Sequence, residues 1–81
     1  MNASARDMTL AILAARAPDA TICPSEVARA IASGPGWRDA MPLVHSAVDR
    51  LLDEGAVRLS WKGQPLVSRA GPYRISRGTR S

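Results

Sequence analysis

The apolar residues of this chain change their spacing at Gly55, from the period of a helix to that of a strand. Within residues 44–52, apolar side chains recur at i, i+3, i+4, i+7 and i+8, namely at Val44, Ala47, Val48, Leu51 and Leu52. Beyond Gly55 they alternate with polar ones, at Val57, Leu59 and Trp61. The pattern predicts a helix with one buried face, ended by Gly55, and then a half-buried strand whose Trp61 turns toward the core.

Two shorter helices are expected ahead of this one. The first covers residues 5–16, with Ser4 as its N-cap and Pro18 just beyond its end. Its inward stripe is predicted to be Met8, Ile12 and Ala15, widened by Leu10 and Leu13. Residues 21–23 suit one short strand. Pro24 then opens the second helix, and the glycine-rich stretch 33–36 ends it.

The start of the long helix and the second half of the hairpin complete the predicted fold. Asp39 is the expected N-cap, because this start places Pro42 in the first turn, where a missing N–H costs little. Residues 62–71 are expected to form a loop and residues 72–76 a return strand. The predicted class is α+β, a winged helix-turn-helix of three helices and a small antiparallel β-hairpin wing, in the order α-β-α-α-β-β. Residues 1–81 form this one domain, with loose termini at 1–4 and 77–81.

Composition excludes several classes of protein. A hydrophobic content of 46% with 22% charged residues is typical of a globular domain. One cysteine and one histidine supply neither an internal disulfide nor a zinc ligand set, and no run approaches the roughly 20 apolar residues of a membrane span. We therefore expect a cytoplasmic protein without metal, cofactor or membrane contact.

Positive charge is concentrated at the carboxyl end. Residues 55–81 contain no acid and six basic residues, which are Arg58, Lys62, Arg69, Arg74, Arg77 and Arg80. Residues 1–54 contain five arginines and all seven acids, so a formal +6 follows a formal −2. Because contacts from Lys and Arg to phosphate supply most non-specific affinity, a cationic hairpin behind a helix-turn-helix favours nucleic acid as the partner, with duplex DNA first.

The order of several short motifs resembles a bacterial family catalogued as domain of unknown function 3253. The resemblance covers roughly residues 8–76, and its most specific part is residues 22–29, Ile-Cys-Pro-Ser-Glu-Val-Ala-Arg. The pairs Trp37-Arg38, Met41-Pro42, Glu54-Gly55 and Gly71-Pro72 follow in the same order. The resemblance implies a small winged-helix fold and a role with nucleic acid, and it assigns no functional residue.

In such a fold the third helix enters the major groove and the wing lies along the DNA backbone. Near the bases we expect Arg38, His45 and Ser46, with Arg50 within reach of a phosphate. The wing cations expected on phosphates are Arg58, Lys62, Arg69, Arg74 and Arg77. Trp37 is expected to pack the turn onto the core.

Acidic residues on the third helix keep a second function open. Asp49, Asp53 and Glu54 share or adjoin the face of Arg50, where they would repel a phosphate. The alternative is a protein–protein interaction module that docks this face or the hairpin edge on a partner. A further alternative gives the arginines no ligand and makes them a solvated surface. The chain is expected to be a monomer or a weak homodimer, because no helix is spare for a dimer interface.

No enzyme is predicted. His45, Ser46 and Asp49 are the residue types of a hydrolytic triad, but Ser46 projects about 100° away from His45 around a helix. Nothing near them in the sequence suggests an oxyanion hole.

Overall fold

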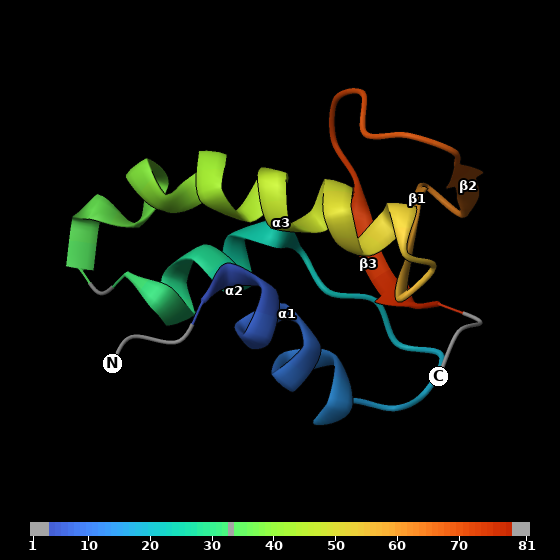
Figure 1. Cartoon of the computed structure of the whole chain (residues 1–81), viewed down its shortest axis with the longest axis horizontal. Helices are drawn as coiled ribbons and strands as arrows, with labels where there is room; N and C mark the ends of the chain where they lie inside the picture. The colour runs from blue at the N-terminus through green and yellow to red at the C-terminus, as the bar shows by residue number, and fades with distance from the viewer. Residues whose placement is uncertain (1–3, 33, 79–81) are drawn as a thin grey trace.

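The computed structural model describes residues 4–32 and 34–78 and has an α+β fold, as predicted. Its helices are α1 (Ala5–Ala14), α2 (Pro24–Ile31), a 3-10 helix η1 (Gly34–Ala40) and α3 (Met41–Asp53). Its strands are β1 (Val57–Trp61), β2 (Gln64–Leu66) and β3 (Arg74–Arg77), in one antiparallel sheet of order β2-β1-β3. Figure 1 shows α3 along the long axis, with the sheet at its carboxyl end. The arrangement is compatible with a winged helix-turn-helix.

The core joins the three helices to one face of the sheet. Its fully enclosed side chains come from α2, α3, β1, β3 and the α1–α2 connection, and include Ile22, Val27, Val44, Val48, Leu51, Val57, Leu59 and Ile75. In β1 the buried residues alternate with Arg58 and Ser60, which therefore point to the outer face. The apolar pattern of the sequence predicted this division correctly for α3 and for the start of β1.

The buried stripe of α1 differs from the predicted one. Ser4 does cap the helix, accepting a hydrogen bond from the Asp7 backbone N–H at 3.0 Å. The most buried residues are Thr9 and Leu13, whereas Ala15 is exposed and follows a helix that already ends at Ala14. Burial of Thr9 is tolerated because its hydroxyl donates to the carbonyl of Ala5 at 2.7 Å.

The connection between α1 and α2 joins the edge of the sheet. Ile22 and Ile75 exchange two backbone hydrogen bonds of 2.8 Å, so the strand predicted at residues 21–23 is reduced to a single pairing. The carboxylate of Glu26 accepts from the Cys23 backbone N–H at 2.8 Å and caps α2. This bond, supported by Arg16, lowers the pKa of Glu26.

A 3-10 helix replaces the predicted cap at the start of α3. Residues 34–40 already wind helically, and Ala40 keeps right-handed helical angles where the chain passes into α3. Asp39 is therefore not the N-cap. Pro42 does lie in the first turn, and Trp37 packs against the core as expected. Gly55 follows the helix with a φ of 76°, the left-handed conformation predicted for its carboxyl end.

The segment predicted as a loop after Trp61 contains a strand. Lys62 and Gly63 have φ values of 51° and 80°, which make a two-residue hairpin turn, and Trp61 pairs with Gln64 beyond it. The resulting β2 is an edge strand with Pro65 opposite Ser60. The predicted inward position of Trp61 is wrong, since its side chain is 39% exposed at a point where the sheet has passed the core.

The last residue of β3 clamps the end of α1. The Arg77 guanidinium donates to the carbonyls of Leu13 (2.9 Å), Ala14 (3.3 Å) and Arg16 (2.9 Å). Carbonyls at a helix carboxyl end have no partner within the helix, and a cation there is favourable. Arg77 was expected in a loose tail, and this contact explains its order; residues 1–3 and 79–81 of the expected loose termini lie outside the described residues.

Arg77→Gln should lower the free energy of unfolding by about 1–2 kcal/mol, because three carbonyls lose a charged donor. Urea denaturation measures the change. Arg58→Gln is the matched control, since Arg58 is exposed and makes no side-chain hydrogen bond with the described part of the chain. The control should change stability by less than about 0.5 kcal/mol. Equal stability of the two variants would contradict the clamp.

Candidate nucleic-acid interface

The exposed side of α3 carries Ser46 and Arg50 one turn apart. Both point away from the buried stripe of Val44, Val48 and Leu51. Arg38 is exposed on η1, immediately before α3. These three side chains keep the accessible positions that the sequence predicted for residues near the bases or a phosphate.

His45 is instead held by the loop that precedes β3. Its Nδ1 lies 2.7 Å from the Tyr73 hydroxyl, and the two rings are tilted with centroids 5.6 Å apart. Burial, helped by the charge of Arg69, lowers the pKa of His45, and Asp49 opposes this shift. Burial also raises the pKa of Tyr73 to about 12. Near neutral pH this is a contact between two uncharged groups, and it occupies one of the two ring nitrogens that could read a base.

Two acids, one on α3 and one at its carboxyl end, are neutralised by arginines from other elements. Asp49 receives two hydrogen bonds of 3.1 Å from Arg69, which lies in the loop before β3. Glu54, just after the helix, receives bonds of 2.7 and 2.6 Å from Arg6 of α1. Exposed pairs of this kind add little stability, but each removes a net negative charge from the helix surface.

Arg50 is left without an acidic partner in the described part of the chain. It lies between the two acids that Arg69 and Arg6 neutralise. The repulsion that the sequence predicted between this face and a phosphate is therefore reduced to the charge of Asp53. Arg50, in the last turn of α3, is thus an exposed cation beside a single unpaired acid of the described helix surface, Asp53.

A second cationic cluster surrounds Trp37. The guanidinium carbons of Arg29, from α2, and Arg38 each lie 4.6 Å from the centre of the indole ring. Such contacts fix the planar groups while their N–H donors stay available to an anion. Arg29 was absent from the sequence-based site residues. Its spacing of eight residues from Trp37 crosses a turn, so no local pattern signals the contact.

The wing cations differ in what they contact, although the register of β1 and β3 places Arg58 and Arg74 on the same face of the sheet. Arg58 lies on the outer face of the sheet, and Lys62 at the hairpin turn is exposed. Arg74 donates to the Thr21 hydroxyl at 2.7 Å and to the Thr21 carbonyl at 3.1 Å. Arg77 binds the end of α1 and Arg69 binds Asp49, so three of the five predicted wing residues have partners inside the protein.

The described residues offer no metal centre. They contain no group of three or more His, Cys, Asp or Glu side chains placed to hold an ion. Cys23 is half-buried, and its sulfur accepts a hydrogen bond from the Ser25 hydroxyl at 3.0 Å. Within the described ranges, every helix is too short or too polar to cross a bilayer.

The family described as Protein of unknown function (DUF3253) matches residues 2–78. The chain belongs to this family. The match covers nearly the whole chain and confirms the resemblance noted in the motifs from Ile22 to Pro72. A search of curated proteins gives no match.

The lowered pKa of His45 predicts a loss of stability in mild acid. Since the ordinary value is 6.5 and the folded value is lower, the unfolded chain binds the proton first. The contribution of uncharged His45 to the free energy of unfolding is fully present above pH 6.5. It falls as the pH drops below 6.5 toward the folded pKa. The carboxylate of Glu26, with its lowered pKa, loses its contribution only at more acidic pH.

Urea denaturation at about pH 7.5 and about pH 5.5 measures this effect. His45→Gln should abolish most of the difference between the two conditions. The assignment fails if the variant retains the same pH dependence as the original chain.

Proposed function

We propose that this protein is a non-enzymatic nucleic-acid-binding module that uses the exposed face of α3 together with η1 and the hairpin turn. Arg38 and Arg50 bind phosphates of duplex DNA, Ser46 lies near the base edges, and Lys62 contacts the backbone from the hairpin turn. The neutralisation of Asp49 and Glu54 carries the proposal, because it leaves Arg50 as an exposed cation with Asp53 as the one unpaired acid of this face among the described residues. A net charge of +4 supports it at longer range.

The same observation disfavours the acidic face of α3 as a docking site for a protein. That alternative depended on three adjacent carboxylates, of which two are held by arginines. Asp53 remains as a single exposed charge among the described residues of this face. A partner that recognises a negative surface therefore finds little to bind.

The proposed contacts differ from those expected of a wing-dominated binder. Arg69, Arg74 and Arg77 already donate to groups of the protein, and a phosphate would have to displace those bonds. Arg58 lies on the outer face of the sheet, away from α3. Three phosphate contacts, from Arg38, Arg50 and Lys62, give an expected slope of log K against log salt of about −2.7.

Fluorescence anisotropy with a labelled duplex tests the proposal. Binding should be clear in about 20 mM salt and should weaken with roughly the stated slope. Absence of binding at low salt would refute the nucleic-acid function.

Charge-reversal variants locate the interface. Arg50→Glu and Arg38→Glu should each weaken binding about tenfold at about 50 mM salt and reduce the magnitude of the slope by about 0.9 or more. Arg58→Glu changes the net charge by the same amount on the outer face and serves as the matched control. It should have a clearly smaller effect. Equal losses in all three variants would mean that net charge, rather than the α3 surface, governs binding.

A further inference from the structure

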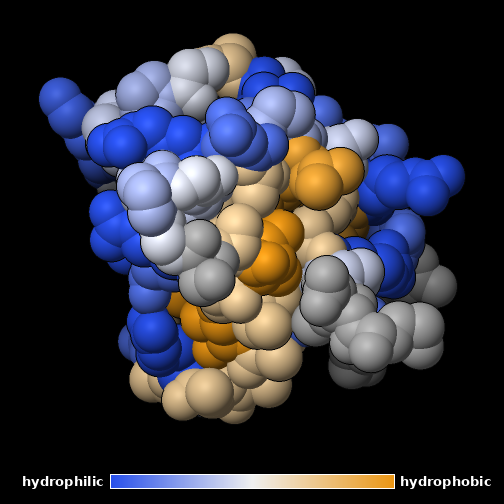
Figure 2. All heavy atoms as spheres, turned by 90° about the vertical axis from the view of Figure 1, so that its left-hand side faces the viewer, coloured by the Kyte–Doolittle hydropathy of each residue, from blue (hydrophilic) through white to orange (hydrophobic). Residues whose placement is uncertain are grey.

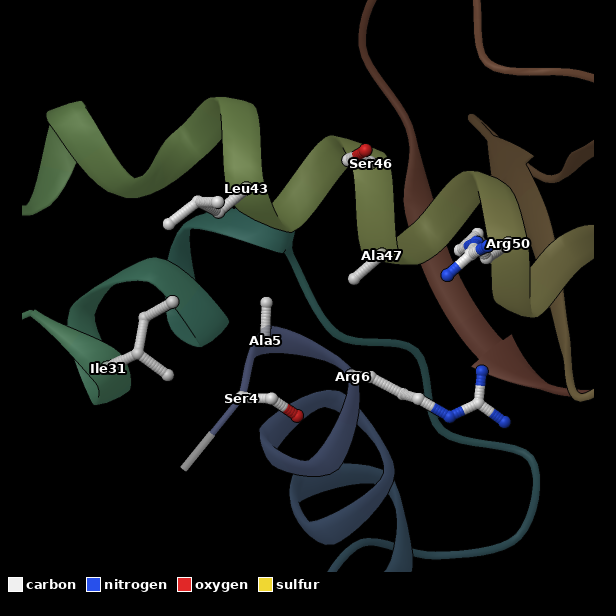
Figure 3. Close-up of a pocket in the computed structure, with 8 residues that line it drawn as sticks. All are labelled: Ser4, Ala5, Arg6, Ile31, Leu43, Ser46, Ala47 and Arg50. Carbon is white, nitrogen blue, oxygen red and sulfur yellow. The ribbon is translucent and has the colours of Figure 1, made fainter. Parts of the chain in front are cut away.

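A groove lies where the first turn of α1, the end of α2 and the first half of α3 meet. Its volume is about 450 Å³, within the range of small-molecule sites. Ala5, Ile31, Leu43 and Ala47 provide its apolar lining. Figure 3 shows these side chains converging from the three helices, and Figure 2 shows an apolar band on this end of the molecule between hydrophilic borders.

Part of the apolar lining stands outside the core, although Ala5 and Ile31 pack against it. Leu43 is 65% exposed, although α3 buries its neighbour Val44 completely. A large aliphatic side chain on the open edge of a concave apolar surface is unusual in a small protein, whose exposed apolar residues are normally scattered. The groove is therefore a surface to which an apolar body can add without rearranging the core.

The polar groups of the groove favour an anion. Arg6 and Arg50 lie at one end, and Figure 3 shows both side chains on the same side of the apolar lining. Arg6 is occupied by Glu54, whereas Arg50 makes no ion pair in the described ranges. An aliphatic lining that ends in a guanidinium without an ion pair in the described ranges matches a ligand with an apolar body and a carboxylate head.

We infer that this groove binds a small amphiphilic carboxylate. The apolar chain lies against Ile31, Leu43 and Ala47, and the carboxylate accepts hydrogen bonds from Arg50. A second copy of the protein fits the groove less well, because among the described carboxylates of this α3 surface Asp49 and Glu54 already have arginine partners and Asp53 alone could pair with Arg50. The inference stands apart from nucleic-acid binding, although both sites use Ser46 and Arg50.

Sodium octanoate is a suitable probe, followed by two-dimensional NMR of the labelled protein without nucleic acid. Octanoate should shift amide signals of the groove saturably at millimolar concentration or below, whereas octylamine, with a cationic head, should not. Arg50→Gln should weaken octanoate binding about tenfold. Ala47→Met should abolish saturation, because the longer side chain fills the groove from α3.

Ala11→Met is the matched control for the filled groove, since Ala11 is exposed on α1 and does not line it. The control should bind octanoate like the original chain. Unfolding curves verify that each variant is folded. If Ala47→Met does not fold, Arg50→Gln still tests the inference through the charge.

The inference would be overturned by the absence of a saturable shift with octanoate, by equal binding of octylamine, or by unchanged affinity in Arg50→Gln. A dimer that Ala47→Met dissociates would also overturn it, since the groove would then be the interface between copies. Octanoate binding in a protein that ignores DNA would refute only the nucleic-acid proposal.

Discussion

The arginines of β3 hold the helical part of the molecule to its sheet. Arg74 binds Thr21, and Arg77 binds the end of α1. Ile75, which lies between these two arginines in β3, pairs with Ile22. These contacts fix the α1–α2 connection against the sheet edge and hold the end of α1, which also packs against α2 and α3. The position of α1 in turn brings Arg6 to Glu54 and forms one wall of the groove. Arg74 and Arg77, which the sequence predicts to bind a ligand, thus stabilise the fold.

The electrostatic character of α3 depends on the same long-range contacts. In the sequence, the second half of this helix is acidic, and its acids argue against a phosphate near Arg50. In the folded protein, arginines 20 and 48 residues away neutralise two of those acids. The charge of a surface is therefore a property of the fold rather than of the segment that forms it. Because these acids are neutralised, the proposed nucleic-acid interface lies mainly on α3 rather than on the wing.

Local patterns predicted what depends on neighbours in the chain. Four features rest on interactions within a few residues of the chain: the Ser4 cap, the helix start at Pro24, the left-handed Gly55 and the buried stripe of α3. The failures depend on distant structure. Trp61 continues the alternation of β1, but the core does not extend beneath it. Asp39 is a good cap that the preceding 3-10 helix makes unnecessary. The partners of Arg69, Arg74 and Arg77 have no signature in the sequence, so the predicted interface included residues with structural contacts.

Pro65 has a consequence for how copies of this protein can meet. It occupies the middle residue of the edge strand β2, where it offers no N–H to an incoming chain. At the opposite side, the chain at Ile22 already covers β3. Intermolecular sheet extension, the usual route from an exposed hairpin to fibrous aggregates, is thereby discouraged at both margins. Crowded solutions of this domain should stay free of β-linked polymers even though Val67, next to β2, is almost fully exposed.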